Sequence, residues 1–328
     1  YCSNGAIFST SETIAISGGG VRPFLAKYRA DGELEWVRVP YATNGPMYDA
    51  NSFAAAVPDG TIRFTGRFRT SMTFGLAGEA TQTTLTSTAS SFDVFVASYS
   101  TTGGLLWAKR AGGASSEGSN SIAAYATGEC LITGMFIDSM LLGEGEPGET
   151  ELTASFGVGN AFVARYSTTG TLEWAQKIAL SGGATAGYSV LTLADDGAIV
   201  AGTFDGENNL LLSRILPTGE ISWTQLAARA FTFDGHALAL FGNGDFACTG
   251  RFRYTATFGA GQPFETSLST GEYDADGFLT VYGQDGTLRY ARAIGGTGND
   301  WGLSVAVGPD GTGLVTGTYS ETVVFGAG

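Results

Sequence analysis

Large apolar residues alternate with small or polar ones in short stretches along this chain, and turn residues separate the stretches. Within residues 93–136, positions 95–99 read Phe-Val-Ala-Ser-Tyr and positions 105–108 read Leu-Leu-Trp-Ala. Two further apolar stretches follow at 122–125 and 131–136. A period of two is that of a strand with one buried face, and glycine or polar turns between such runs favour hairpins. The segment therefore predicts four short antiparallel strands.

The same marks recur at fixed spacing. An aromatic residue follows a large apolar residue by twelve positions in five copies, and a glycine precedes that aromatic by four. The pairs are Phe24 and Trp36, Phe95 and Trp107, Phe162 and Trp174, Leu211 and Trp223, and Phe278 and Tyr290. A second mark, Thr-Gly or Ala-Gly with an aromatic two positions later, has its glycine at Gly66, Gly134, Gly202, Gly250 and Gly317. Repeats of this kind bury their large residues between neighbouring sheets, so we expect Trp107 and Trp174 to be buried.

Four strands in each copy are the content of one β-propeller blade. We label these strands a to d from the channel outward. We expect an all-β fold with one domain over residues 1–328 and four-stranded antiparallel blades, of which six are preferred and seven are the alternative. The blades are expected at about 1–39, 51–110, 119–178, 187–226 and 235–293, with an incomplete one at 301–328. Three copies carry about nineteen extra residues between strands b and c, and these predict hairpin insertions.

Three features of the copies carry a resemblance to a known repeat. They are the run Phe-Val-Ala-x-Tyr-Ser-x-x-Gly-x-Leu-x-Trp-Ala, the Gly-Gly loop after it, and the later x-Thr-Gly-x-Phe and x-Phe-Gly marks. They resemble the bacterial β-propeller repeat, described as seven-bladed, of exported proteins from Gram-negative bacteria that include myxobacteria. The resemblance covers essentially the whole chain. It implies the fold but no activity, because members of that family mostly have no assigned activity and no motif that marks a site.

The composition narrows the class of partner. The 31 acidic and 17 basic residues give a net charge of −14, which disfavours nucleic acid and anionic lipid as partners. No run of eighteen apolar residues is present, so we expect no membrane span. Few lysines and many Ser, Thr and Gly residues favour an extracellular or cell-surface location, with the signal segment outside the given residues.

Three cysteines cannot all pair with one another. Cys130 and Cys248 lie on equivalent strands of copies that are not neighbours, so we expect both to be buried thiols. Cys2 lies at the chain end, where it could pair with a residue outside the given sequence.

The b–c and d–a connections of a propeller share one rim, and ligands usually bind at that rim. Our candidate binding residues on it are Tyr48, Asp49, Glu117, Tyr188, Asp234, His236, Asp300 and Trp301. Asp49, Glu117 and Asp300 each lie seventeen residues before the glycine of the second mark. Converging carboxylates repel one another unless a cation satisfies them, which makes these three candidate Ca²⁺ ligands.

The interpretation that we favour is that each acid accepts hydrogen bonds from backbone amides of its own loop, and that no cofactor is bound. His236 is the one histidine of the chain, and it is either a general base beside Asp234 or a solvated loop residue. The rim aromatics could stack on sugar rings or anchor a protein partner.

The repeated and similar copies favour a non-enzymatic surface module. We expect such a module to bind a protein or glycan, or to assemble with itself, through the rim that bears the insertions. The alternative is a polysaccharide hydrolase that uses two of the rim carboxylates, which requires two carboxylates in unlike environments. A third hypothesis is a purely structural spacer domain of a larger surface protein.

Overall fold

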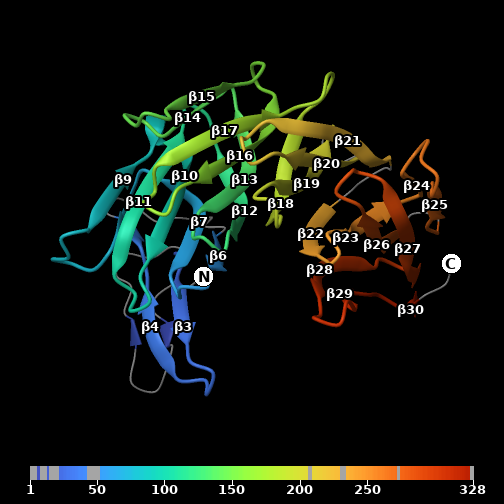
Figure 1. The fold of residues 1–328 in the computed structure, drawn as a ribbon, viewed down its shortest axis with the longest axis horizontal. Coiled ribbons are helices and arrows are strands. Elements are labelled where there is room, and N and C mark those ends of the chain that lie inside the picture. Colours follow the sequence, from blue (N-terminus) through green and yellow to red (C-terminus); the bar gives the residue numbers. More distant parts are fainter. Residues whose placement is uncertain are drawn as a thin grey trace. The chain divides into compact units, whose positions relative to one another are not determined.

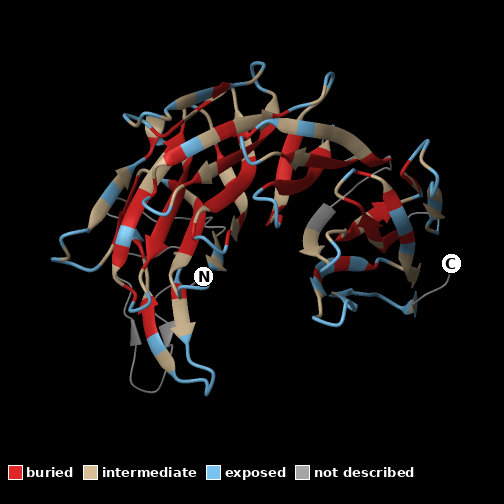
Figure 2. Cartoon of the chain, viewed as in Figure 1, coloured by how far each residue is buried: buried red, intermediate tan, exposed pale blue. Residues whose placement is uncertain are grey.

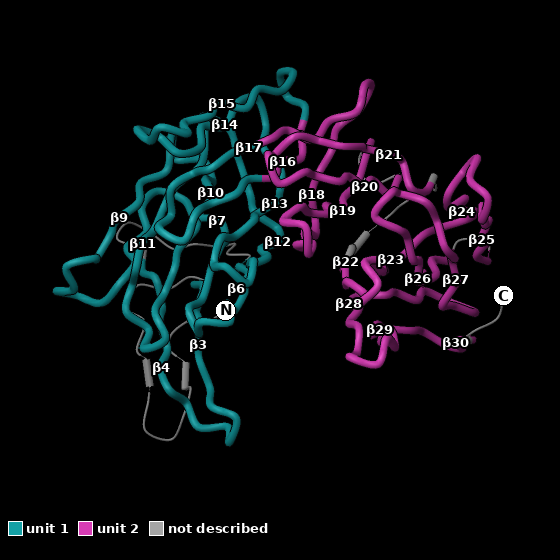
Figure 3. Tube along the Cα trace, viewed as in Figure 1, with its two compact units in different colours: residues 1–158, 164–175 teal, residues 159–163, 176–328 magenta. Residues whose placement is uncertain are grey.

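The computed structural model describes residues 6–7, 13–14, 22–42, 52–205, 209–229, 234–271 and 274–325. These residues form strands and one short 3₁₀ helix, η1 (Thr88–Ser90), and no α-helix (Figure 1). Contacts divide the chain into two compact units (Figure 3). Unit 1 comprises Tyr1–Val158 and Ala164–Ala175, and unit 2 comprises Gly159–Val163 and Gln176–Gly328. The prediction of one domain over residues 1–328 stays a prediction.

The strands of the first three copies follow the order that the repeat predicts. The first copy contains two separate pairs, β1 (Ala6–Ile7) with β2 (Thr13–Ile14) and β3 (Leu25–Tyr28) with β4 (Leu34–Arg38). The second copy pairs β6 (Ser52–Ala56), β7 (Ile62–Arg69), β10 (Phe92–Tyr99) and β11 (Leu105–Gly112) in that order. The third copy pairs β12 (Gly118–Ala124), β13 (Cys130–Ile137), β16 (Gly159–Tyr166) and β17 (Leu172–Ile178).

The later copies repeat the arrangement. The fourth pairs β18 (Thr185–Thr192), β19 (Ala198–Phe204), β20 (Asn209–Ile215) and β21 (Ile221–Arg229). The fifth pairs β22 (Asp234–Leu240), β23 (Phe246–Arg253), β26 (Ala275–Tyr282) and β27 (Leu288–Thr297). The sixth contains β28 (Trp301–Val307) paired with β29 (Gly313–Thr318). The all-β fold with antiparallel sheets is therefore as predicted, whereas the number of blades stays a prediction.

The residues between strands b and c form short strands that join neighbouring copies. These strands are β8 (Ser71–Phe74), β9 (Thr83–Thr86), β14 (Ser139–Leu142), β15 (Thr150–Thr153), β24 (Thr255–Phe258), β25 (Thr266–Ser269) and β30 (Thr322–Phe325). β8 pairs with β5 (Tyr41–Ala42), which follows strand d of the first copy. β14 pairs with β15 and also with the end of β11, where Leu142 lies opposite Ala111. β24 pairs in the same way with β21, and β30 with β27. Each of these segments therefore extends the sheet of the preceding copy, a connection that the sequence pattern does not reveal.

The large residue of strand c is fully buried in the second to fifth copies, whereas Phe24 of the first copy is 36% exposed. Figure 2 shows the buried segments along the strands of each unit. Phe95 is fully buried, and its ring centroid lies 5.2 Å from that of Phe64 and 5.0 Å from that of Phe74. Phe278 repeats the contact in the fifth copy, 5.2 Å from Phe258. Phe74 and Phe258 lie on the short strands between b and c, so these strands contribute to the core through the hydrophobic effect.

The tryptophan of strand d holds two copies together. Trp36 donates from Nε1 to the Thr101 carbonyl oxygen at 3.0 Å, and Trp107 donates to the Thr168 carbonyl oxygen at 2.9 Å. Trp223 makes the same bond in unit 2. In each case the acceptor lies in the c–d turn of the following copy, so the indole satisfies its donor while its ring is packed. Trp107 is buried, as expected, whereas Trp174 is half-buried.

Two other predictions can be compared with the described residues. Cys130 and Cys248 are free and buried, as predicted. No helix among the described residues is long and apolar enough to cross a membrane.

Candidate functional site: two buried carboxylate pairs, a cavity and a cleft

Two acidic residues from neighbouring copies meet at the start of strand c. Asp93 and Asp276 each precede the large apolar residue of strand c by two positions. The Glu117 amide donates to the Phe92 carbonyl oxygen at 2.8 Å, and the Asp300 amide donates to the Ala275 carbonyl oxygen at 2.6 Å. These backbone bonds place the loop acid of one copy beside the strand c aspartate of the copy before it. The structure therefore contains two equivalent pairs, Asp93 with Glu117 and Asp276 with Asp300.

A glycine at the end of strand d makes room for each strand c aspartate. A Cβ atom on Gly112 would lie 2.3 Å from Cγ of Asp93, and one on Gly295 would lie 2.1 Å from Cγ of Asp276. Both distances are far below van der Waals contact, so neither position tolerates a side chain. Sequence reasoning named Glu117 and Asp300 but missed Asp93 and Asp276. The available signal was the equal spacing from each strand c aspartate to the Gly-Gly that ends strand d.

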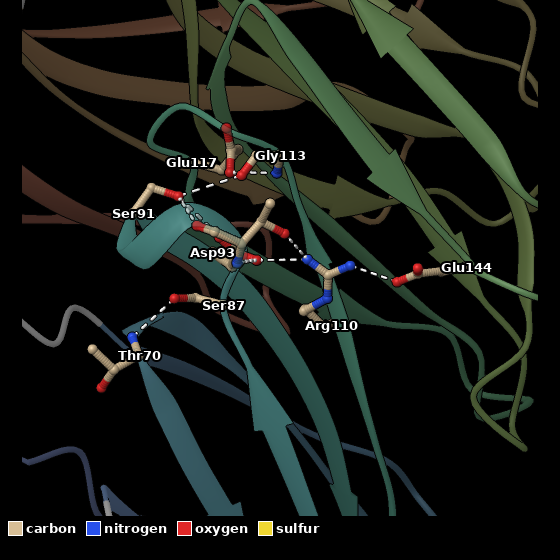
Figure 4. A network of polar contacts seen from close by, with 9 residues as sticks. Thr70, Ser87, Ser91, Asp93, Arg110, Gly113, Glu117 and Glu144 are labelled. Atoms are coloured by element: carbon tan, nitrogen blue, oxygen red, sulfur yellow. Dashed lines mark hydrogen bonds and ion pairs between the residues drawn. The ribbon is translucent and has the colours of Figure 1, made fainter. Parts of the chain in front are cut away.

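The first pair includes an arginine (Figure 4). The Arg110 guanidinium donates to Oδ2 of Asp93 at 2.8 Å and forms an ion pair with the exposed Glu144. The Thr88 amide donates to the same Asp93 oxygen at 3.0 Å. Burial raises the pKa of the Asp93 carboxyl, and the hydrogen bonds from Arg110 and Thr88 oppose that rise. Asp93 is thus a buried carboxylate with its own cation.

Glu117 is the neutral member of the first pair. Its side chain is 1% exposed; Oε2 accepts a bond from the Gly113 amide at 2.9 Å, and Oε1 is buried without a hydrogen-bond partner. Burial raises the pKa of Glu117 to about 8, and the charge of Asp93 adds to the rise. The carboxyl is therefore mostly protonated at pH 7. The bond to Gly113 lies within its own loop, which is the kind of contact that we favoured for this residue.

The second pair has no arginine. Phe95 lies opposite Arg110 in the β10–β11 ladder, and the corresponding Phe278 lies opposite Ala293 in the β26–β27 ladder. Asp300 is 1% exposed; Oδ1 accepts a bond from the Ser320 amide at 3.1 Å, and Oδ2 is buried without a hydrogen-bond partner. The two pairs therefore differ chemically, although they occupy equivalent places.

Asp276 has no cation to stabilise its charge. Its Oδ1 is buried and lacks a hydrogen-bond partner. Burial raises the pKa of Asp276 to about 6, and the negative charges of Asp300 and Asp274 contribute. The isolated bridge between Ala275 and Asn299 runs parallel, so the next residues of the two segments, Asp276 and Asp300, lie alongside one another.

A cavity of about 380 Å³ opens beside the second pair, and we call it the β27–β29 cavity. Its lining includes Arg292, Ala293, Asp300, Trp301, Val315 and Tyr319. Tyr319 is 65% exposed, whereas Phe136 and Phe252, at the equivalent positions of other copies, are fully buried. In those copies strand b also pairs with strand c, whereas in the described part β29 pairs with β28 alone.

A second hollow lies among the short strands of unit 1, and we call it the insertion cleft. It has a volume of about 390 Å³, and its lining includes Thr84, Thr86, Lys109, Arg110, Glu144 and Glu146. Lys109 forms an ion pair with Glu146, whose other oxygen accepts a bond from the Leu172 amide at 2.7 Å. Both cations of the cleft are therefore paired with a carboxylate.

The remaining predicted site residues have varied positions. Tyr48 and Asp49 lie outside the described residues, and Asp234 and His236 are described only as backbone positions of β22. Tyr188 is half-buried within β18 rather than on an exposed loop. Trp301 is 37% exposed, and the Arg251 guanidinium lies 4.3 Å from its ring centroid.

The predicted calcium site is not visible in the part of the chain that the structure describes. Within it, no three His, Cys, Asp or Glu side chains are grouped so that they could hold a metal ion. Ca²⁺ binding by Asp49, Glu117 and Asp300 stays a prediction, as does the absence of a cofactor.

Comparison with known proteins finds similar solved structures but no matching family. No protein-family model matches the chain, and no curated protein matches it. Among solved structures, the chain is similar to a gluconolactonase from Xanthomonas campestris, with 11% sequence identity and a TM-score of 0.23. The match covers 75% of this chain and 86% of that one.

The neighbour is an enzyme, which contradicts the expectation that this chain is not one, and that expectation is withdrawn. The expectation relied on copies that seemed chemically alike, and the two carboxylate pairs show that they are not. A likeness at this TM-score carries no argument about the reaction or the substrate of this chain.

Proposed function

We propose that this chain is an exported β-propeller that binds a glycan at its insertion cleft. The observation that carries the proposal is a polar hollow, formed by the short strands between b and c, whose charged side chains are held in place before any ligand arrives. Its volume of about 390 Å³ falls within the range of small-molecule sites and suits one or two sugar units.

The charges of the cleft indicate a neutral ligand. Lys109 is paired with Glu146 and Arg110 with Glu144, so neither cation requires an anionic partner. Ion pairs of this kind still present donors and acceptors to hydroxyl groups. Thr84 and Thr86 add two hydroxyls at the cleft wall, on the exposed face of β9. A neutral sugar matches this set of groups better than a charged ligand does.

Arg110 is fixed in position from behind. Its bond to the buried Asp93 anchors one end of the guanidinium, while the other end reaches Glu144 at the cleft. A donor that is already ordered loses less conformational entropy when a ligand binds. The buried Asp93 therefore supports binding without touching the ligand.

The test is binding of soluble neutral polysaccharides, such as a β-glucan, a mannan and a galactan, with a polyuronate for comparison. We expect at least one neutral polymer to bind in calorimetry. Thr84→Val with Thr86→Val should weaken that binding about tenfold, which corresponds to ~1.4 kcal/mol. Ser267→Ala is the matched control, because it removes a hydroxyl from the corresponding strand β25 of another copy. Failure of every neutral polymer to bind, or equal binding by the double variant, would refute the proposal.

A second candidate function, hydrolysis of a polysaccharide, is favoured by one observation. Asp276 and Asp300 lie side by side, Asp300 lines the β27–β29 cavity, and the pKa of Asp276 is raised to about 6. A carboxyl of raised pKa beside a second carboxyl is the pairing that glycoside hydrolysis uses. The measurement is release of reducing ends from the same polymers. Wild-type release that Asp300→Asn abolishes would support hydrolysis, and no release by the wild type would eliminate it.

A further inference from the structure

We infer that the 113–117 loop is a pH-sensitive connection between the second and third copies, held closed while the Glu117 carboxyl keeps its proton and released as that proton is lost. The inference does not depend on glycan binding at the insertion cleft. It comes from the geometry of the first carboxylate pair and from a second junction of the same chain that has no carboxyl groups.

The contacts that hold the loop closed involve Glu117 at both ends. Its amide donates to the Phe92 carbonyl oxygen at 2.8 Å, and its Oε2 accepts a bond from the Gly113 amide at 2.9 Å. The loop also lies against the start of β14, because a Cβ atom on Gly113 would lie 2.0 Å from the Ser139 carbonyl oxygen. The Glu117 side chain, 1% exposed, is therefore enclosed where the two copies meet.

A charged Glu117 would have to share the cation of Asp93. The Arg110 guanidinium is bound to Asp93 at one end and to Glu144 at the other (Figure 4). Oε1 of Glu117 stays buried without a hydrogen-bond partner although Arg110 is present. An ionised Glu117 would thus lie near the buried Asp93 carboxylate with one oxygen unpaired, and both circumstances are costly.

The charged groups nearest the loop come from the segments packed around it. They are Arg67 on β7, Asp93 on β10, Arg110 on β11, Asp138 after β13 and Glu144 after β14. Arg67 lies against Gly118, and its guanidinium is 4.9 Å from the Phe92 ring centroid. Asp138 accepts a bond from the Ser115 hydroxyl at 2.6 Å. Among the described residues, two cations therefore accompany three carboxylates here before Glu117 ionises.

The loop should open more often as pH rises. Burial raises the pKa of Glu117 to about 8 while the loop is closed, and a carboxyl that reaches water returns to its ordinary value of 4.5. Between these values the closed loop holds a proton that the open loop releases, so the ratio of open to closed loop rises nearly tenfold per pH unit. The closed loop is favoured most below pH 4.5, and its advantage is lost by pH 8.

The junction between the third and fourth copies lacks ionisable groups at the same positions. Asn160 and Thr185 stand where the first pair has Asp93 and Glu117. The Thr185 hydroxyl accepts a bond from the Ala161 amide at 2.8 Å, which connects the two copies without a carboxyl. Neither Asn160 nor Thr185 titrates, so the corresponding 181–185 loop is an internal control.

The experiment measures hydrogen exchange of the folded chain at pH 5, 6 and 7 by mass spectrometry, with each rate divided by that of an unstructured peptide at the same pH. Loop amides exchange through local opening, so the free energy of global unfolding does not set their rates. Protection of the 113–117 loop should fall roughly seventyfold from pH 5 to pH 7, whereas protection of the 181–185 loop should stay constant. Glu117→Gln keeps an acceptor for the Gly113 amide and cannot ionise, so protection of its 113–117 loop should also stay constant.

Three results would overturn the inference. They are a fall of less than about threefold for the wild-type 113–117 loop, an equal fall for the 181–185 loop, and an equal fall for the 113–117 loop of Glu117→Gln. The first two comparisons use the wild-type chain, so the test does not depend on how well the variant folds.

Discussion

Replacement of Glu117 by glutamine should change how stability depends on pH. The pKa of Glu117 is about 8 in the folded chain against an ordinary value of 4.5. Between these two values the folded protein holds a proton that the unfolded chain has released, so the free energy of unfolding falls as pH rises through this window. The slope approaches ~1.4 kcal/mol per pH unit, which gives roughly 2 to 3 kcal/mol between pH 5 and pH 7.

Glutamine cannot ionise, yet its side-chain oxygen can still accept the Gly113 amide. We therefore expect Glu117→Gln to lack this contribution, so that its unfolding free energy relative to wild type rises by roughly 2 to 3 kcal/mol from pH 5 to pH 7. Urea unfolding at pH 5, 6, 7 and 8, followed by circular dichroism, measures the difference. Glu151→Gln, at an exposed position on β15, is the control for the exchange of Glu for Gln itself. A difference for Glu117→Gln that is constant with pH would show that burial does not hold the proton there.

Three other predictions concern the contacts between copies and the buried thiols. Trp107→Phe removes the donor to the Thr168 carbonyl oxygen and should lower stability by about 1 to 2 kcal/mol in urea unfolding, with an unchanged circular dichroism spectrum. Gly134→Ala should lower the free energy of unfolding by about 3 kcal/mol or more in the same assay, because the added Cβ would lie 1.9 Å from the Gly118 carbonyl oxygen. A decrease of less than about 1 kcal/mol would contradict the β12–β13 packing. Cys130, fully buried, should react with a thiol reagent only in denaturant, and rapid labelling of Cys130 itself in the native chain would show that its strand opens.

The repeat predicted the strands well because each copy has a strong local pattern. Strand period, turn glycines and the twelve-residue spacing all depend on residues close in sequence, and the four-stranded order of the second to fifth copies agrees with them. Burial of Phe95 and Phe278 also follows from that pattern, because the alternation of side chains places both residues on the apolar face of their strands.

The site was predicted only in part. Glu117 and Asp300 were named as isolated rim acids, but their partners Asp93 and Asp276 were missed because each partner belongs to the preceding copy. Their separations of 24 residues exceed the range of any local pattern. Tyr188 was expected on an exposed loop and lies within β18, since this strand begins earlier than the spacing indicated.

By itself, the sequence determined the class of fold, the order of strands and the residues of each core, because these follow from periodicity and turn chemistry within one copy. Only the tertiary structure decided which carboxylates meet. It also decided that the short strands between b and c extend the sheet of the preceding copy. Arg110 neutralises one carboxylate pair, whereas Ala293 at the equivalent position leaves the other pair without a cation. The physical reason is that charge and burial depend on neighbours in space, and in a repeat protein those neighbours come from the next copy along the chain.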